Sequence, residues 1–132
     1  MVEVSVTASI QVRGGPTLSL GEPLEPESYA FASIELAAPD ERQAMLLPDG
    51  GKVILLGLSV RFDDGGEPDE TAKITITPVN GAAKGDEFEV AGSLMIANEG
   101  ALSALVAGGP RSLTLKNAGS DPVVVDILSC RI

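Results

Sequence analysis

The sequence predicts an all-β protein: a single-domain antiparallel β-sandwich, jelly-roll-like, with about seven or eight short strands. Three observations favour this class. Apolar and polar residues alternate with a period of two in several segments. Clusters of Gly, Pro, Asn and Asp separate these segments at intervals of roughly 8–14 residues. The chain of 132 residues contains no linker of domain length, so residues 1–132 are predicted to form one domain.

The first third of the chain predicts two strands with an extended segment between them. Residues 2–12 alternate cleanly, with aliphatic side chains on one face and Glu, Ser and Thr on the other. Residues 17–28 carry two prolines and three glutamates, which favours a short extended piece and a loop, and residues 15–28 are a candidate arm. Residues 29–38 alternate again, with Tyr29 and Phe31 opposite Ala30 and Ala32. One helical turn after Pro39 is an open alternative before the turn sequence PDGG.

The middle of the chain continues the pattern of strands and turns. The run from Val53 to Leu56 is apolar without alternation, which is typical of a strand covered on both faces. Residues 71–79 alternate as a strand, and Pro78 suggests a sheet edge or a strand end. Residues 88–96 form a predicted strand with an interruption at Gly92.

The last part predicts a closing hairpin. Residues 97–110 favour either one short helix or a strand edge, and the sequence leaves both open. Residues 111–117 and 122–132 read as two strands of a hairpin. In the second strand, Val123, Val125 and Ile127 share one face, and Val124, Asp126 and Leu128 share the other.

Charge and composition restrict the classes of partner. A formal net charge of -10 at pH 7 argues against non-specific nucleic-acid binding and against docking on anionic lipid. The sequence also predicts no signal peptide and no transmembrane helix. With no Trp, one Tyr and three Phe, the core must be aliphatic. Such a thin core is a hint of a homo-oligomer, although an aliphatic core adequate for a monomer remains an alternative.

Few residues in the chain carry reactive chemistry. There is no His and one cysteine, Cys130, so a Ser/His/Asp triad and a cysteine-based zinc site are excluded. Cys130 lies in an apolar strand pattern and is interpreted as a small apolar residue. We therefore expect no enzyme activity, no catalytic residues and no cofactor.

One acidic loop, DDGGEPDE at residues 63–70, has the oxygen ligands that Ca²⁺ prefers. Its spacing does not match an EF-hand loop, and a solvated connection between strands is the alternative reading. The candidate calcium ligands in this loop are Asp63, Asp64, Glu67, Asp69 and Glu70.

The last third of the chain, FEVAGSLMIANEGALSALVAGGPRSLTLKNAGSDPVVVDILSCRI, resembles the C-terminal half of small virion proteins of tailed bacteriophages, most of all capsid decoration (cement) proteins. The resemblance implies a structural protein that binds the outer surface of the shell through the major capsid protein or another virion protein. It also implies a homo-oligomer, with a trimer favoured, and a protein made in the host cytoplasm and located in the virion.

The resemblance transfers no functional residues. A phage tail or baseplate component is the close alternative. A non-catalytic β-sandwich binding module that uses its acidic loop is a second alternative.

Overall fold

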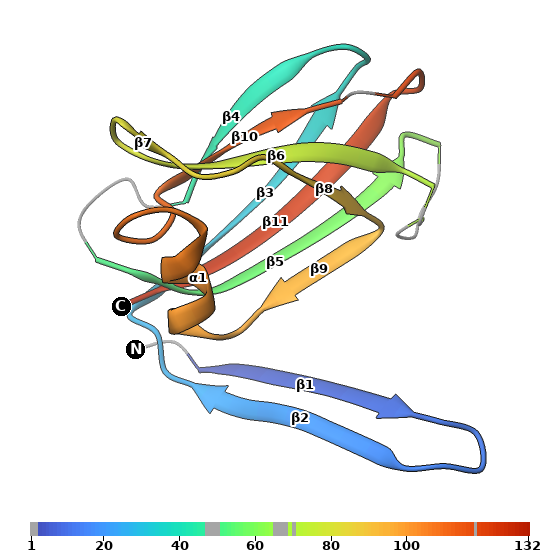
Figure 1. The fold of residues 1–132 in the computed structure, drawn as a ribbon, viewed down its shortest axis with the longest axis vertical. Coiled ribbons are helices and arrows are strands. Elements are labelled where there is room, and N and C mark those ends of the chain that lie inside the picture. The colour runs from blue at the N-terminus through green and yellow to red at the C-terminus, as the bar shows by residue number, and fades with distance from the viewer. Residues whose placement is uncertain (1–2, 47–50, 65–68, 70, 118) are drawn as a thin grey trace.

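The computed structural model describes residues 3–46, 51–64, 69, 71–117 and 119–132, without the side chains of residues 22 and 23. In these residues the chain forms eleven strands and one short helix, and every strand pairing is antiparallel. The predicted all-β, sandwich-like fold class is confirmed. Two sheets pack face to face, and a separate hairpin projects from them (Figure 1).

The sandwich consists of two sheets that we call sheet I and sheet II. Sheet I has the order β3 (Ser28–Leu36), β11 (Val123–Arg131), β5 (Val53–Phe62) and β9 (Ser93–Ile96). Sheet II has the order β4 (Glu41–Met45), β10 (Ser112–Lys116), β6 (Lys73–Asn80) and β7 (Ala83–Lys84), and β8 (Phe88–Ala91) also pairs with β6. The separate hairpin consists of β1 (Val4–Gln11) and β2 (Thr17–Leu24).

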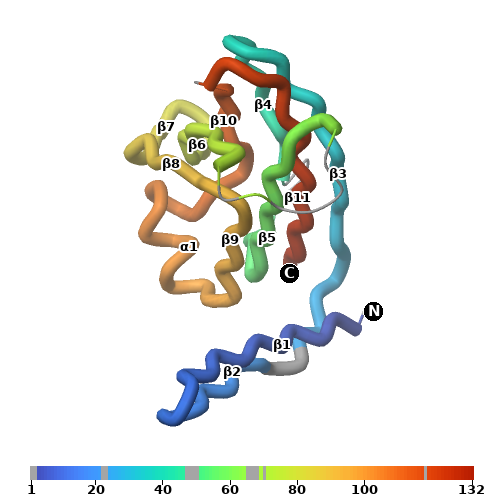
Figure 2. Tube along the Cα trace, turned by 90° about the vertical axis from the view of Figure 1, so that its right-hand side faces the viewer, coloured from blue at the N-terminus to red at the C-terminus, as the bar shows by residue number. Residues whose placement is uncertain are grey.

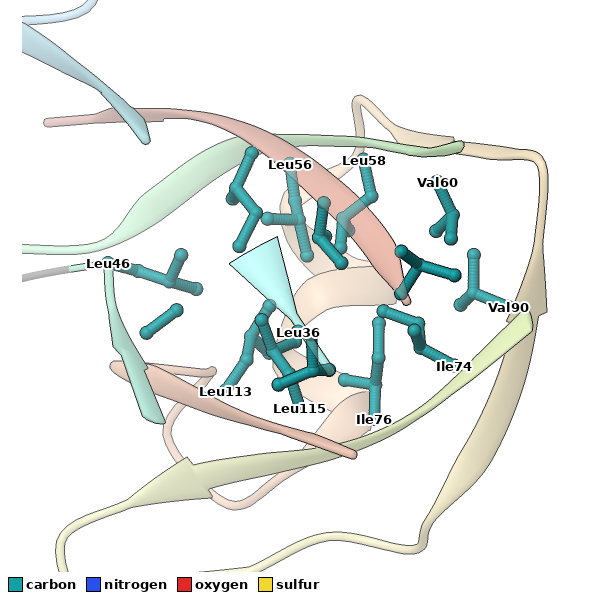
Figure 3. Close-up of a cluster of buried hydrophobic side chains, with 14 of the residues drawn as sticks. Leu36, Leu46, Leu56, Leu58, Val60, Ile74, Ile76, Val90, Leu113 and Leu115 are labelled. Atoms are coloured by element: carbon teal, nitrogen blue, oxygen red, sulfur yellow. The ribbon is translucent and has the colours of Figure 1, made fainter. Parts of the chain in front are cut away.

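The space between the two sheets is filled by aliphatic side chains, as the composition predicts. Leu36, Val60, Ile76, Leu113 and Leu115 have no exposed surface and come from both sheets (Figure 3). Each buried aliphatic side chain of this size contributes about 1.5–3 kcal/mol relative to an exposed one. Two of the four aromatic residues, Phe62 and Phe88, pack only at the margin of this core.

The ambiguous segment 97–110 contains a helix, α1 (Glu99–Leu105). Its start is set by Asn98, whose side-chain oxygen accepts a hydrogen bond from the Ala101 N–H at 2.9 Å. This N-cap satisfies one of the free N–H groups of the first turn. Leu102, with 1% of its surface exposed, anchors the helix in the core.

The predicted C-terminal hairpin is wrong. β10 pairs with β4 and β6 in sheet II, whereas β11 pairs with β3 and β5 in sheet I, so the chain crosses between sheets after Lys116. Asn117, 1% exposed, holds the crossing. Its side-chain amide donates to the carbonyl oxygens of Leu36 (3.0 Å) and Asp121 (2.8 Å), and its side-chain oxygen accepts from the Gly119 N–H (3.0 Å). Each of β10 and β11 buries an apolar face. Alternation shows that such a face exists, but it does not show whether two strands are neighbours in one sheet or lie in opposite sheets across the core.

The predicted count of seven or eight strands is too low for three reasons. Residues 17–24 form a full strand where a short extended piece and a loop are predicted, because β2 pairs with β1. Residues 41–45 form a strand where one helical turn is an open alternative, because β4 pairs with β10. At Gly92 (φ 74°) the predicted strand of residues 88–96 divides into β8 in sheet II and β9 in sheet I. The short strand β7 extends the hairpin after β6.

Pro78 does not mark a sheet edge or a strand end. It lies inside β6, which pairs with β10 along one side. On the other side, β8 pairs with residues 73–76 and β7 pairs with residues 79–80. Pro78 occupies the gap between these two pairings, where the missing N–H removes no ladder hydrogen bond.

Candidate functional site

The β1–β2 hairpin, which we call the arm, has one apolar face and one polar face. Cross-strand pairs on the apolar face include Ala8 with Leu20 and Ile10 with Leu18, whereas Ser9 lies opposite Ser19 on the polar face. The arm turns at residues 12–16, where the Gly15 N–H donates to the carbonyl of Val12 at 2.8 Å. The sequence predicts a strand here correctly, but alternation does not show whether the apolar face is covered.

The base of the arm is fixed to the outer face of sheet I. Val6 (8% exposed) packs with Leu55 (4%) and Cys130 (1%), and Val4 and Leu24 lie beside this small cluster. Leu55 is therefore covered by the arm, whereas Leu56 faces the core between the sheets. This confirms the prediction that the strand beginning at Val53 is covered on both faces. The arm does not belong to the core between the sheets.

Cys130 lies beneath the arm, as its place in this cluster shows. Burial raises the pKa of its thiol, because the apolar surroundings disfavour the thiolate. The thiolate is the reactive form of cysteine, so this residue is inert in the folded chain. The interpretation of Cys130 as a small apolar residue is confirmed.

Beyond its base the arm leaves the sandwich, and its apolar face is not covered. Figures 1 and 2 show the turn of the hairpin far from the place where its base is attached. Ile10, Leu18 and Leu20 are each 50–54% exposed. A crevice of about 360 Å³ separates this face from β9, and Val6, Ala8, Leu20, Met95 and Ala97 are among the residues that line it.

The outer face of sheet I carries a second exposed apolar surface. One row of facing positions crosses its four strands, through Phe31, Leu128, Gly57 and Met95. Phe31 is 63% exposed and Met95 50%, and Gly57 contributes no side chain between them. Tyr29, 59% exposed, lies two residues before Phe31 on the same face. Half of the chain's aromatic residues are thus turned to solvent side by side.

The arm and this outer face together hold most of the exposed large apolar side chains. Among the described residues nine such side chains are exposed, and seven of them lie on these two surfaces. Single exposed apolar residues are normal on a protein, but several that share one face mark a candidate interaction site. The seven are Ile10, Val12, Leu18, Leu20, Tyr29, Phe31 and Met95.

The acidic loop does not gather its carboxylates into one site in the described residues. Asp69 uses one carboxylate oxygen to accept hydrogen bonds from the Thr71 hydroxyl (2.6 Å) and the Thr71 N–H (2.8 Å). These bonds lower the pKa of the Asp69 carboxyl because they stabilise its charged form. Asp63 and Asp64 instead line an open cavity of about 470 Å³ with Asp121.

Glu67 and Glu70 lie outside the described residues. Within the part of the chain that the structure describes, no three His, Cys, Asp or Glu side chains are placed to hold a metal ion. The same part contains no helix long and apolar enough to cross a membrane.

Sequence reasoning missed the exposed aromatic pair on β3. The signal was present, because Tyr29 and Phe31 share their face with Ser33 and Glu35, whereas the opposite face holds only Ala, Ile and Leu. On the opposite face only Ile34 and Leu36 are covered, because Ala30 and Ala32 are exposed and line a crevice beside β4. The aromatic side chains nevertheless face solvent, which reverses the usual expectation for large apolar side chains.

No protein-family model, curated protein or solved structure matches the chain. The function must therefore be inferred from the chain's own residues.

Proposed function

We propose that the chain is a structural virion protein, a capsid decoration protein that binds the outer surface of a phage shell and stabilises it. The observation that supports this proposal is the arm, which presents an uncovered apolar face away from a complete sandwich. A surface of this kind suits a protein that is built into a larger assembly, because removal of apolar area from water is the dominant favourable term in most protein–protein association.

The charge of the chain suits a shell partner with a basic outer patch. A net charge of -10 accelerates encounter with a positively charged surface and slows it with an acidic one. The partner in this proposal is the major capsid protein. A homo-oligomer, favoured as a trimer, would bind several shell subunits at once and gain avidity through effective concentration.

The test is co-sedimentation of the purified protein with shells of the phage that encodes it, prepared without this protein. We expect binding at a fixed number of copies per shell subunit, and a higher temperature at which the shells break. Because charge steers the encounter, the association rate should fall as salt is raised.

A matched pair of measurements distinguishes a capsid decoration protein from a tail component. Isolated tails of the same phage are sedimented with the protein under identical conditions. Binding to tails but not to shells would overturn the decoration proposal and favour a tail or baseplate component, and binding to neither would overturn both.

A further inference from the structure

The surface area of the chain exceeds that of a compact monomer. The exposed area is 7754 Å² for a mass of 13.5 kDa, whereas folded monomers of this mass expose about 6,500 Å². The excess of about 1,200 Å² is larger than the roughly 800 Å² that each partner buries in a standard protein–protein interface. The projecting arm is the visible source of extra surface (Figure 2).

The apolar face of the arm is turned toward the side on which sheet I lies. Val6 at the base contacts the outer face of that sheet, and Ala8 and Leu20 line the crevice beside β9. Ile10 and Leu18 continue the same face toward the turn, where they are more than half exposed. The apolar face of the distal half of the arm could therefore pack on a sheet, but no sheet of the same chain covers it.

The chain offers such a surface on β3. Tyr29 and Phe31 lie on the outer face of sheet I, the face to which the arm base already binds. Cys130, in that anchoring cluster, is the direct cross-strand neighbour of Tyr29. The exposed pair is therefore continuous with an existing arm–sheet contact, and each copy has both an uncovered arm and an uncovered receiving strand.

Charges at the two surfaces are also complementary. Arg13 lies in the turn of the arm, and Glu35 lies on the outer face of β3, four residues beyond Phe31. An arm that places Leu18 over Phe31, with its turn toward the Leu36 end of β3, brings Arg13 near Glu35, because four strand residues span about 13 Å. The opposite direction along β3 would turn Arg13 toward Glu27, an exposed acidic residue four positions before Phe31, so an acidic partner is available in either direction.

We propose that the distal arm of one copy binds the outer face of β3 in a second copy, with Ile10, Leu18 and Leu20 over Tyr29 and Phe31. The contact joins two different surfaces, so a two-fold dimer forms it twice and a ring of three forms it three times. The inference rests on the proposed function and deepens it, because it assigns the apolar face of the arm to the contact between copies and leaves the other surfaces of the oligomer to meet the shell.

The first test is the native mass of the purified protein without shells, by light scattering coupled to size exclusion. We expect a closed dimer or trimer that raised salt does not dissociate, since the contact is apolar and salt screens the repulsion between copies of charge -10. A monomer at every concentration up to about 100 µM, a concentration at which a contact of micromolar Kd would be saturated, would overturn the inference.

Variants locate the contact. Leu18→Ser with Leu20→Ser should shift the protein to monomer, because both side chains are exposed in the single chain and their loss leaves the sandwich intact. The matched control is Ser9→Ala with Ser19→Ala, a facing pair on the polar side of the same arm, which should keep the oligomer. An oligomer that persists unchanged in the leucine variant would also overturn the inference.

A cross-link identifies the two partners. Chains carrying Leu18→Cys and chains carrying Phe31→Cys, distinguished by tags of different length, are produced together and oxidised. We expect a disulfide between the two kinds of chain, with the native Cys130 unreactive because it is buried. Absence of this disulfide in an oligomer that forms normally would place the contact elsewhere and refute the proposal. Shell binding is measured separately, so either proposal can fail without the other.

Discussion

Val6 is the residue whose truncation most directly tests how the arm is held. It is 8% exposed and packs against Leu55 and Cys130. Val6→Ala removes two buried methyl groups, at about 0.8 kcal/mol each, so the docked arm should lose roughly 1.5 kcal/mol. This corresponds to an increase of about tenfold in the fraction of molecules whose arm base is lifted.

Cys130 provides the assay, because it is the single cysteine and lies beneath the arm. A chromogenic disulfide reagent at pH 8 and low micromolar protein should react with this thiol only when the arm base opens. We expect the reaction rate to rise about tenfold in Val6→Ala, with little change in the melting temperature of the sandwich, because the arm is a separate two-stranded sheet.

Val12→Ala is the matched control for this prediction. Val12 is the same residue type in the same segment, but it is 53% exposed and lies outside the anchoring cluster. Its variant should react at the rate of the native chain. Equal rates in both variants would refute the reasoning, as would a loss of melting temperature in Val6→Ala comparable to that of a core substitution.

Three further predictions concern single side chains. Asn117→Ala should cost roughly 2–3 kcal/mol in urea denaturation, because it removes the side-chain donor to the buried Leu36 carbonyl and to the part-buried Asp121 carbonyl, whereas Asn80→Ala, at an exposed hydrogen bond, should cost less than about 1 kcal/mol. Thr71→Val should raise the pKa of Asp69 toward its ordinary value of 3.8 in a carbon-detected NMR titration, and an unchanged pKa would contradict the assigned hydrogen bonds. Cys130 has a raised pKa in the folded state, so its contribution to stability is complete below about pH 8.5 and is lost as the pH rises through the folded pKa. The free energy of unfolding should therefore fall more steeply above about pH 8.5 in the native chain than in Cys130→Ala.

The candidate site was only partly predictable from the sequence. The prolines and glutamates of residues 15–28 favour an extended arm, and the structure pairs most of this segment with β1 in a hairpin. The carboxylates of the acidic loop are close in sequence and therefore suggest a calcium site. The structure shows instead that the Asp69 carboxylate accepts hydrogen bonds from Thr71. The exposure of Tyr29 and Phe31 could be predicted only from Ser33 and Glu35 on the same strand face, because the hydropathy of aromatic residues by itself places them inside.

Local sequence determined where several of the strands of this protein lie. Period-two alternation identified β1, β3, β6 and β11, because side chains of a strand point to alternate faces whatever the strand packs against. The absence of His and the single cysteine excluded a Ser/His/Asp triad and a cysteine-based zinc site. These properties depend on neighbours in sequence or on composition alone.

Tertiary structure decided which strands are partners and which faces are covered. The crossing at Asn117, the division of one strand at Gly92 and the exposed face of the arm all depend on contacts between residues distant in the chain. An alternating strand has the same pattern in a hairpin, in an opposed sheet or in a projecting arm, because the pattern records two faces but not their surroundings. The surfaces that we propose for assembly became visible only when the sandwich left them uncovered.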